Sequence, residues 1–281
     1  MNADMQRPDP QRLSINTATV REQWDLGQII DGCARHGIRA ISPWRDQVQQ
    51  LGLKETARRI RANELAVSGY CRGGMFTHAD GAAGLAARDD NRRAVDEALE
   101  VGAQCLVLVV GGLPAGSKDL GAARQQVRDG IAELLDYAGP RNLPLAIEPL
   151  HPMYAGERAC VNTMRHANDL CDELGDEGLG IAVDLYHTWW DPELEQQIRR
   201  AGKQRVLAFH ICDWLVPTTD LLLDRGMMGD GVINIARWRR LVESLGYDGF
   251  HEVEIFSAAN WWKRPPDEVL ATCKERHQSF C

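Results

Sequence analysis

Apolar residues gather along the chain in short runs that are separated by longer amphipathic stretches. Eight of these runs have the length expected of strands: 14–19, 38–44, 65–71, 104–110, 143–149, 179–185, 206–212 and 249–256. Several are almost continuously apolar, which is typical of strands buried on both faces of a parallel sheet. The pattern therefore predicts a parallel sheet covered by helices.

Between the runs, apolar residues recur at helical spacing, as at Leu26, Ile29, Ile30 and Cys33 after the first run. Four of these stretches end in a glycine just before the next strand, at His36-Gly37, Val101-Gly102, Leu174-Gly175 and Leu245-Gly246. Glycine at this place suits the left-handed residue that ends many helices. The helices are thus expected to stop where the strands begin.

Eight alternating units in 281 residues favour an α/β fold, a single (β/α)8 TIM barrel over residues 1–281, with a polar N-terminal extension at 1–13. A doubly wound sheet would usually carry a glycine fingerprint after its first strand. The first run and the residues directly after it, SINTATVREQW, contain no glycine. The barrel is therefore the better interpretation.

The charge and the cysteine content of the chain disfavour some classes of function. The chain has 40 acidic against 32 basic residues, a net charge of −8, which disfavours binding to nucleic acid. Its eight cysteines include no Cys-x-x-Cys pair, so buried free thiols in a reducing compartment are expected. Neither a signal peptide nor a membrane-spanning run is evident, and we expect a cytoplasmic protein without membrane contacts.

Four of the last strand-like runs each carry one side chain that can bind a metal. These are Glu148, Asp184, His210 and Glu254, one from each of strands five to eight. In a parallel barrel the carboxyl ends of the strands meet at one mouth, so the four side chains are expected to converge. Three carboxylates and one imidazole suit Mn²⁺, Mg²⁺, Co²⁺ or Zn²⁺.

Each of the four residues alone has an ordinary explanation, such as a helix cap, an ion pair or a hydrogen-bonded core histidine. Three carboxylates buried together are costly without a cation. The set as a whole therefore predicts a metal site.

With these residues in view, the chain resembles the xylose isomerase-like TIM-barrel superfamily, known as the sugar phosphate isomerase/epimerase family. The family pattern matches Glu148, Asp184 followed by His187, His210, Arg225 and Glu254. The resemblance implies one divalent metal ion, most often Mn²⁺, and proton transfer beside a carbonyl. It implies that Glu148 and Glu254 are also the catalytic acid and base, and that His187 and Arg225 contact the substrate.

Two polar residues depart from the generic pattern. His151, in EPLHP, is expected either to act as an extra catalytic base or to orient Glu148. Asp213 is expected to be an outer partner of His210 or a substrate contact. The glycine-rich segment 226–231 is expected to be a flexible flap over the metal.

Tryptophans form a further departure. Six of the eight follow predicted strand ends: Trp44, Trp189, Trp190, Trp214, Trp261 and Trp262. Indole rings suit stacking on sugar faces, and Trp44 and Trp214 are the predicted substrate contacts, although packing between loops would explain the set equally well.

The leading hypothesis is a metal-dependent sugar or keto-sugar isomerase or epimerase. The alternative is a lyase that cleaves 3-oxo-glycosides by β-elimination, as in related deglycosidase catalytic subunits, with His151 as base. A DNA-repair phosphodiesterase is disfavoured by the charge of −8, and a metal-free binding barrel by the complete ligand set. By family analogy we expect a small sugar or glycoside as partner and a homo-oligomer, with room for a small partner subunit.

Overall fold

The computed structural model describes residues 7–281. Nine parallel strands form one sheet in the order β3-β2-β1-β11-β8-β7-β6-β5-β4. Their bounds are β1 Leu13–Asn16, β2 Ala40–Ser42, β3 Ala66–Val67, β4 Tyr70–Gly74, β5 Leu106–Val109, β6 Leu145–Ile147, β7 Leu179–Asp184, β8 Val206–Ile211 and β11 His251–Val253. A separate antiparallel pair consists of β9 Asp213–Trp214 and β10 Arg225–Gly226.

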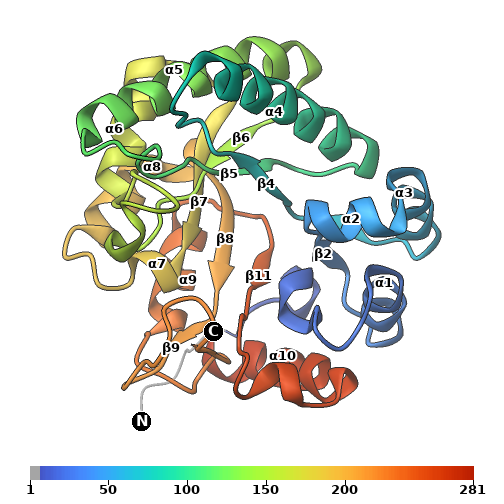
Figure 1. Cartoon of the computed structure of the whole chain (residues 1–281). Coiled ribbons are helices and arrows are strands. Elements are labelled where there is room, and N and C mark those ends of the chain that lie inside the picture. The colour runs from blue at the N-terminus through green and yellow to red at the C-terminus, as the bar shows by residue number, and fades with distance from the viewer. Residues whose placement is uncertain (1–6) are drawn as a thin grey trace.

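Helices surround the strands on the outside, as Figure 1 shows. They are α1 Leu26–Arg35, α2 Arg45–Leu51, α3 Leu53–Ala62, α4 Gly81–Val101, α5 Leu120–Ala138, α6 Met164–Leu174, α7 Leu185–Thr188, α8 Leu194–Arg205, α9 Ile235–Ser244 and α10 Pro266–Phe280. Short 3-10 turns lie at Pro10–Arg12, Thr17–Val20, Gly139–Arg141, Pro152–Tyr154 and Trp261–Lys263. The predicted (β/α)8 TIM barrel is confirmed.

The third predicted strand differs from its prediction. The run 65–71 was expected to be one strand, but the structure divides it into β3, which pairs with β2, and β4, which continues to Gly74 and pairs with β5. Isolated bridges from Val67 to Ala103 and from Trp44 to Cys71 join the remaining edges. The barrel therefore closes through both halves of this interrupted strand.

Helix ends follow the local sequence. Helix α1 begins with a capping box in which Asp25 and Gln28 bond each other's backbone N–H groups. All four glycines at the predicted helix ends have positive φ angles: 68° at Gly37, 75° at Gly102, 62° at Gly175 and 95° at Gly246. A side chain would strain that backbone, so glycine is what ends these helices at the right place for the next strand.

Small residues fill the inside of the barrel below its mouth. Ala146, Ala182 and Ala208 pack there with Cys71, Cys105 and Val107. Because side chains alternate along a strand, the residues two positions later also point inward. Those residues are Glu148, Asp184 and His210, so strand periodicity alone aims three of the four predicted ligands into the mouth.

The predicted N-terminal extension, 1–13, lies partly outside the described residues. Residues 1–6 lie outside the described part of the chain, and β1 already begins at Leu13. Arg12 donates hydrogen bonds to the carbonyls of Gly249 and Tyr247, at 2.7 and 3.0 Å. The end of the predicted extension is therefore attached to the barrel beside β11.

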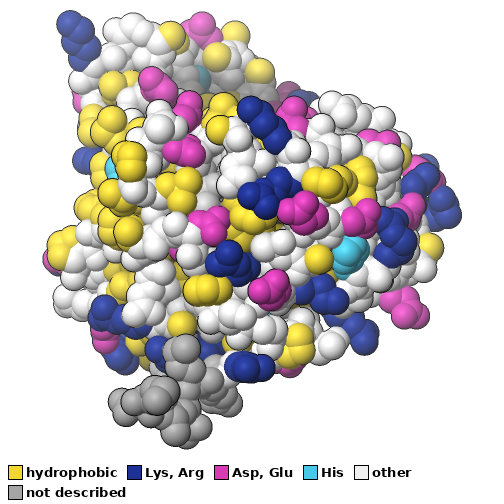
Figure 2. All heavy atoms as spheres, turned by 90° about the horizontal axis from the view of Figure 1, so that it is seen from below, with side chains coloured by type: hydrophobic (Ala, Val, Ile, Leu, Met, Phe, Trp, Pro, Cys, Tyr) yellow, Lys and Arg dark blue, Asp and Glu magenta, His cyan; other side chains and the backbone are white. Residues whose placement is uncertain are grey.

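All eight cysteines are buried and free, as expected. Acidic and basic side chains are interspersed over the face seen in Figure 2. None of the helices within residues 7–281 has both the length and the apolar character that crossing a bilayer requires.

Candidate metal centre

The four predicted ligands meet at the mouth of the barrel. Glu148 follows β6, Asp184 ends β7, His210 lies in β8 and Glu254 follows β11. One ligand atom from each lies within 4.8 Å of those of the other three, and all four residues are buried. The convergence expected from the strand ends is therefore present in the structure.

His210 lies between two carboxylates. Its Nδ1 is 3.0 Å from Glu148 Oε1, and its Nε2 is 3.5 Å from Glu252 Oε1. Burial disfavours the charged imidazole, but Glu252 and Glu148 together outweigh that effect and raise the pKa of His210 well above its usual value. Without a metal, a protonated His210 thus partly compensates the surrounding negative charge.

Arg225, in β10, is the second cation of the group. Its Nη1 donates to Glu254 Oε2 at 2.9 Å and to Asp184 Oδ2 at 3.3 Å. Burial alone would lower the pKa of this guanidinium, but the neighbouring Glu254 and Asp184 raise it. The rings of Tyr186 and Phe256 lie 4.4 and 5.0 Å from the guanidinium carbon and hold it in the mouth. Arg225 therefore points inward, as predicted.

His187 lies beside Arg225 and is buried. The Arg225 Nη2 donates to His187 Nε2 at 3.2 Å, so this nitrogen is the acceptor, because a guanidinium can only donate. Burial, and after it the charge of Arg225, lowers the pKa of His187 well below its usual value. The ring is therefore neutral and carries its proton on Nδ1, which has no hydrogen-bond partner within the described chain.

Negative charge exceeds positive charge in this group. Burial raises the pKa of Asp184 to about 7, Arg225 opposes the shift, and Glu148 and Glu254 add to it. A cation would remove this cost, since carboxylates and imidazole bind hard divalent ions at about 2.0–2.2 Å. The ligand atoms of one such ion would lie within roughly 4.4 Å of one another, and those of this group lie within 4.8 Å. The residues thus fit one divalent metal ion after small side-chain movements.

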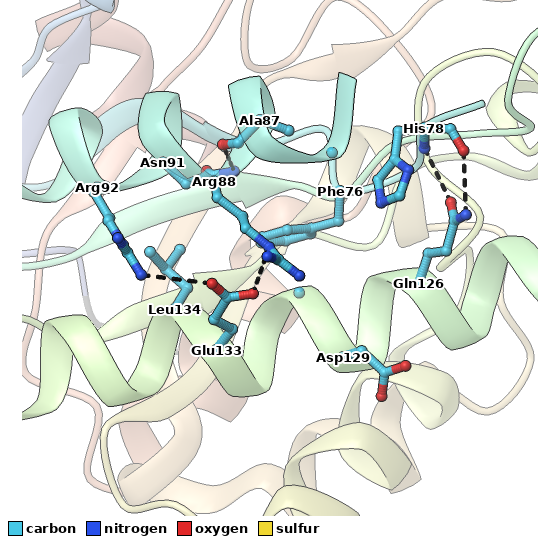
Figure 3. A pocket seen from close by; sticks show the side chains of 12 residues that line it. Phe76, His78, Ala87, Arg88, Asn91, Arg92, Gln126, Asp129, Glu133 and Leu134 are labelled. Carbon is cyan, nitrogen blue, oxygen red and sulfur yellow. Dashed lines mark hydrogen bonds and ion pairs between the residues drawn. The ribbon is translucent and has the colours of Figure 1, made fainter. Parts of the chain in front are cut away.

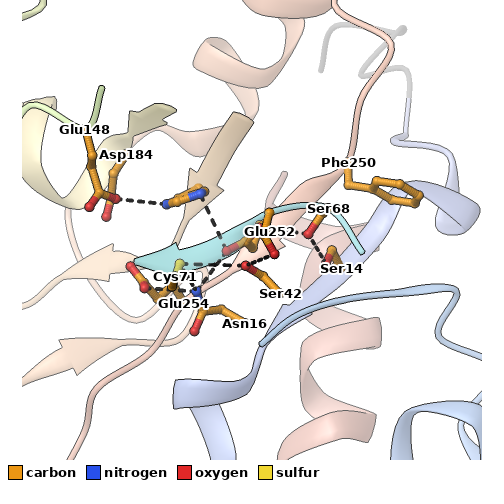
Figure 4. A network of polar contacts seen from close by, with 12 residues as sticks. Ser14, Asn16, Ser42, Ser68, Cys71, Glu148, Asp184, Phe250, Glu252 and Glu254 are labelled. Atoms are coloured by element: carbon orange, nitrogen blue, oxygen red, sulfur yellow. Dashed lines mark hydrogen bonds and ion pairs between the residues drawn. The ribbon is translucent and has the colours of Figure 1, made fainter. Parts of the chain in front are cut away.

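Glu252 is a component of the site that the prediction missed. It is buried in the barrel two residues before Glu254, and Figure 4 shows it between the ligand group and a set of serines. Its oxygens accept from Asn16 Nδ2 at 2.8 Å and from the Ser68 hydroxyl at 2.8 Å. The alternation in HEVEIF could have revealed it, because residues i and i+2 of a strand share a face.

His151 lies apart from the four ligands. Its ring stacks on Trp214 at 5.2 Å and meets Trp190 edge-on at 5.8 Å, and its Nδ1 accepts from the Met153 backbone at 3.3 Å. Among the described residues, no hydrogen bond or ion pair joins His151 to Glu148. The ring belongs to an aromatic cluster, so the structure offers no support for His151 as the residue that orients Glu148.

Asp213 and the glycine-rich segment stabilise each other. The Asp213 carboxylate accepts from the backbone of Trp214, Gly229 and Ile233, at 3.0, 2.9 and 2.9 Å. Met227 and Met228 are fully buried. These contacts attach the segment 226–231 to the barrel, and its movement as a flap stays a prediction. Glu252, not Asp213, faces His210.

The tryptophans at the mouth have different roles. Trp44 lines the cavity beside Glu148 and Glu254, and its Nε1 donates to Asn16 Oδ1 at 2.8 Å. Trp214 packs against Tyr186 and Trp189, with ring centroids 4.9 and 5.7 Å apart. Trp262 donates to the Ala18 carbonyl at 2.9 Å. Trp44 thus lines the cavity, and the others named here pack between loops and the barrel. The substrate contacts of Trp44 and Trp214 stay predictions.

Two hollows meet at the mouth. The inner cavity, beside Glu148 and Glu254, measures about 30 Å³, which is room for an ion with little water. The outer cleft, between α2 and β4, measures about 470 Å³, within the usual range for small-molecule sites. Trp44 and Arg72 line both. A substrate of sugar size thus fits the cleft and reaches the ligand group past these two residues.

A further cavity of about 270 Å³ lies on the outside of the barrel, between α4 and α5. Figure 3 shows Arg88 and Arg92 of α4 reaching Glu133 of α5, and His78 beside Gln126. Its residues include none of the four predicted ligands. It is separate from the chemistry of the mouth.

Known proteins resemble this chain over almost its whole length. A sequence model of the xylose isomerase-like TIM barrel family matches residues 30–273. An inosose isomerase of Bacillus velezensis is 22% identical over 280 residues, covering 94% of this chain and 95% of that protein. A protein from Sinorhizobium meliloti 1021 has a solved structure with 59% identity and a TM-score of 0.95, covering 97% of this chain and 99% of the other.

A second solved structure, of IolI protein with a bound zinc atom, has a TM-score of 0.78 at 18% identity and covers 94% of this chain and 96% of the other. At this identity the likeness concerns the fold alone.

Proposed function

The chain belongs to the xylose isomerase-like TIM barrel family, and from that premise we propose that it is a divalent-metal-dependent isomerase or epimerase of sugars or keto-sugars. The observation that carries the proposal is the buried group Glu148, Asp184, His210 and Glu254, whose ligand atoms lie within 4.8 Å of one another. The full-length similarity to an inosose isomerase supports a cyclic or open keto-sugar as substrate.

The four residues would hold the metal ion. When bound, a divalent cation supplies Lewis acidity that polarises a carbonyl and acidifies the proton beside it. Mn²⁺ remains our prediction because three of the four donors are carboxylates, and Zn²⁺, Mg²⁺ and Co²⁺ are the alternatives. The zinc in the IolI protein structure agrees with a divalent ion in this fold.

Glu148 is the best-placed base. It lines the inner cavity, and only its Oε1 is engaged, by His210. Both oxygens of Glu254 accept hydrogen bonds, one from Asn16 at 3.0 Å and one from Arg225 at 2.9 Å. Glu148 would therefore take the proton from the substrate carbon. In an epimerisation Glu254, across the same cavity, would begin in its acid form and give its own proton to the opposite face of that carbon.

His187 and Arg225 would position the reacting oxygens. The Nδ1 proton of His187 is an unused donor beside the inner cavity, suited to a carbonyl or hydroxyl oxygen. Arg225 keeps that tautomer in place through its bond to Nε2 and holds Glu254 at 2.9 Å. Donors fixed before the reaction stabilise developing negative charge without reorganisation.

The lyase alternative has no observation in its favour. It depended on His151 as a dedicated base, and that ring packs against Trp190 and Trp214 instead. Aromatic walls are also fewer than expected, because Trp44 is the tryptophan that lines the inner cavity of the described structure.

Deuterium exchange tests the proposal directly. The protein is stripped of metal, reloaded with Mn²⁺ or Zn²⁺, and incubated in D₂O with a panel of ketoses, inososes and one chromophoric 3-oxo-glycoside. We expect metal-dependent deuterium incorporation beside the carbonyl, with isomerised or epimerised product. Release of the chromophore without exchange into any ketose would favour the lyase, and exchange that needs no metal would refute the proposed site.

A further inference from the structure

Two arginines line the inner cavity without a carboxylate partner. Arg72 of β4 and Arg158 both face the space beside Glu148 and Glu254. Among the described residues, neither guanidinium has a hydrogen bond or an ion pair; Arg158 contacts the Tyr154 ring, 5.7 Å from its centroid. Both oxygens of Glu254 accept hydrogen bonds from Asn16 and Arg225, and Oε1 of Glu148 lies against His210.

The other arginines of the mouth and cleft are paired. Arg45 bonds Asp90 and Glu97, Arg21 bonds Asp46, and Arg225 bonds Asp184 and Glu254. Since a guanidinium keeps its charge in proteins, burying one without a partner costs free energy. Burial, and then repulsion from Arg158, lowers the pKa of Arg72. Both side chains are partly buried, and the two like charges repel each other, a repulsion that a bound anion would offset.

Tyr154 adds a third donor to the same wall. Its side chain is 7% exposed, lines the inner cavity, and its hydroxyl has no hydrogen-bond partner within residues 7–281. A buried hydroxyl is normally paired, because an unpaired one loses its hydration for nothing. Arg72, Arg158 and Tyr154 together offer hydrogen-bond donors to the cavity. Neither guanidinium forms an ion pair with a carboxylate among the described residues.

The position of Arg72, between the cleft and the inner cavity, indicates that the bound anion is part of the substrate. It lines both the inner cavity and the cleft of about 470 Å³, so anything that enters from the cleft passes it. A metal ion on the four ligands would neutralise most of the negative charge beside it. The remaining field at this wall would then be positive, which suits an anionic group on the substrate itself.

We propose that the substrate is an anionic keto-sugar whose carboxylate or phosphate group is bound by Arg72, Arg158 and the Tyr154 hydroxyl while its carbonyl end lies at the four-residue group. This inference rests on the proposed function for the carbonyl end. The evidence for the anion site itself is the set of unpaired hydrogen-bond donors, and measurements of substrate binding test it independently of the reaction.

Three ketoses that share one skeleton separate the possibilities: fructose, fructuronate and fructose 6-phosphate. Binding to the Mn²⁺-loaded protein is measured by calorimetry, and deuterium exchange is followed in parallel. We expect fructuronate or fructose 6-phosphate to bind at least roughly tenfold more tightly than fructose, because a charge-assisted hydrogen bond contributes about that factor or more. Whichever of the two is preferred identifies the anion as carboxylate or phosphate.

Variants assign the preference to these residues. R72Q and R158Q should each weaken binding of the preferred anion roughly 10- to 100-fold and leave fructose unchanged. R72K should retain part of the preference, and Y154F, which keeps the ring, should cost roughly 3- to 10-fold. R92Q, in the outer cavity between α4 and α5, is the matched control and should bind like the unmodified protein.

Equal binding of all three ketoses, or no binding of any, overturns the anion site. So does an anion preference that survives in both R72Q and R158Q with folded protein by circular dichroism. A preference that depends on Arg72 and Arg158, in a protein that exchanges no deuterium into any ketose, supports the anion site and refutes the proposed reaction. The two failures are thus distinguishable.

Discussion

The two halves of the barrel mouth differ in charge and in how far their side chains are paired. The half formed by β6, β7, β8 and β11 carries the buried carboxylates, and His210 and Arg225 are bonded to them. The half formed by β2 and β4 opens into the cleft and carries Trp44 and the unpaired Arg72. We propose that the first half holds a cation and that the second receives the body of a substrate.

One hydrogen-bonded chain joins the two halves. The Trp44 indole donates to Asn16, and Asn16 donates to both Glu252 and Glu254. The orientation of the cleft wall is thus linked to the orientation of a predicted metal ligand. Changes on the ligand side should abolish the chemistry, whereas changes on the cleft side should weaken substrate binding.

Removing a ligand is expected to have the largest effect. The E254Q substitution removes one charged metal ligand and one of the two carboxylate partners of Arg225. We expect kcat to fall at least roughly 10³-fold, since the metal supplies several kcal/mol to the transition state. Metal content by atomic absorption should fall with it. E133Q, on α5, is the matched acidic control; full activity with bound metal in E254Q would contradict the ligand assignment.

Loss of the partner behind His210 should have an intermediate effect. E252Q keeps the size of the side chain but removes the charge that lies 3.5 Å from His210 Nε2. We expect metal affinity to fall roughly 10- to 100-fold, as is usual for such partners of metal-bound histidines. Competitive titration against a chelating dye measures it. An unchanged affinity would mean that Glu252 serves only to pair Asn16 and Ser68.

Acidity should weaken metal binding on the ligand side alone. The pKa of His210 is raised and that of Asp184 lies at about 7, so protons occupy ligand atoms in acid and must leave when the ion binds. Metal affinity should therefore increase with pH, about tenfold per unit for each proton displaced. Proton release in weak buffer is the second measure. Affinity that stays constant between pH 5 and 7 would refute this coupling.

The smallest effect is expected on the cleft side. W44F removes the donor to Asn16 and part of the aromatic surface at the junction of the two hollows. We expect KM to increase roughly 2- to 10-fold, the range of a single aromatic contact, with metal content unchanged. W238F, on α9, is a control outside both hollows. A loss of metal in W44F would show that the cleft wall also maintains the ligand group.

The strand order and the group of four predicted ligands could be predicted, because strand alternation and helix ends are set by residues near one another in the sequence. Alternation places Ala182 and Asp184 on one strand face, and the glycines after the helices predict where the strands begin. The interruption between β3 and β4 could not be predicted, since the pairing of each half with a different neighbour is a property of the closed barrel.

The surroundings of His151, Arg72 and Arg158 could not be predicted from neighbouring residues in the sequence. His151 is close to Glu148 in sequence, yet a loop carries its ring to Trp190 and Trp214. Arg72 and Arg158 are far apart in sequence and line one cavity. No sequence motif marks either arginine. What distinguishes them is that neither has an ion-pair partner among the described residues, and ion-pair partners are set by contacts in the folded structure.

The sequence by itself determined the barrel and the convergence of Glu148, Asp184, His210 and Glu254, because strand period and strand-end position are set by neighbouring residues along the chain. Only the tertiary structure decided that Glu252 lies behind His210, that Asp213 bonds the backbone of the loop 226–231, and that Arg72 is left unpaired at the cleft. These outcomes depend on which side chains meet across strands and loops, and electrostatic pairing acts through space at distances of a few ångströms.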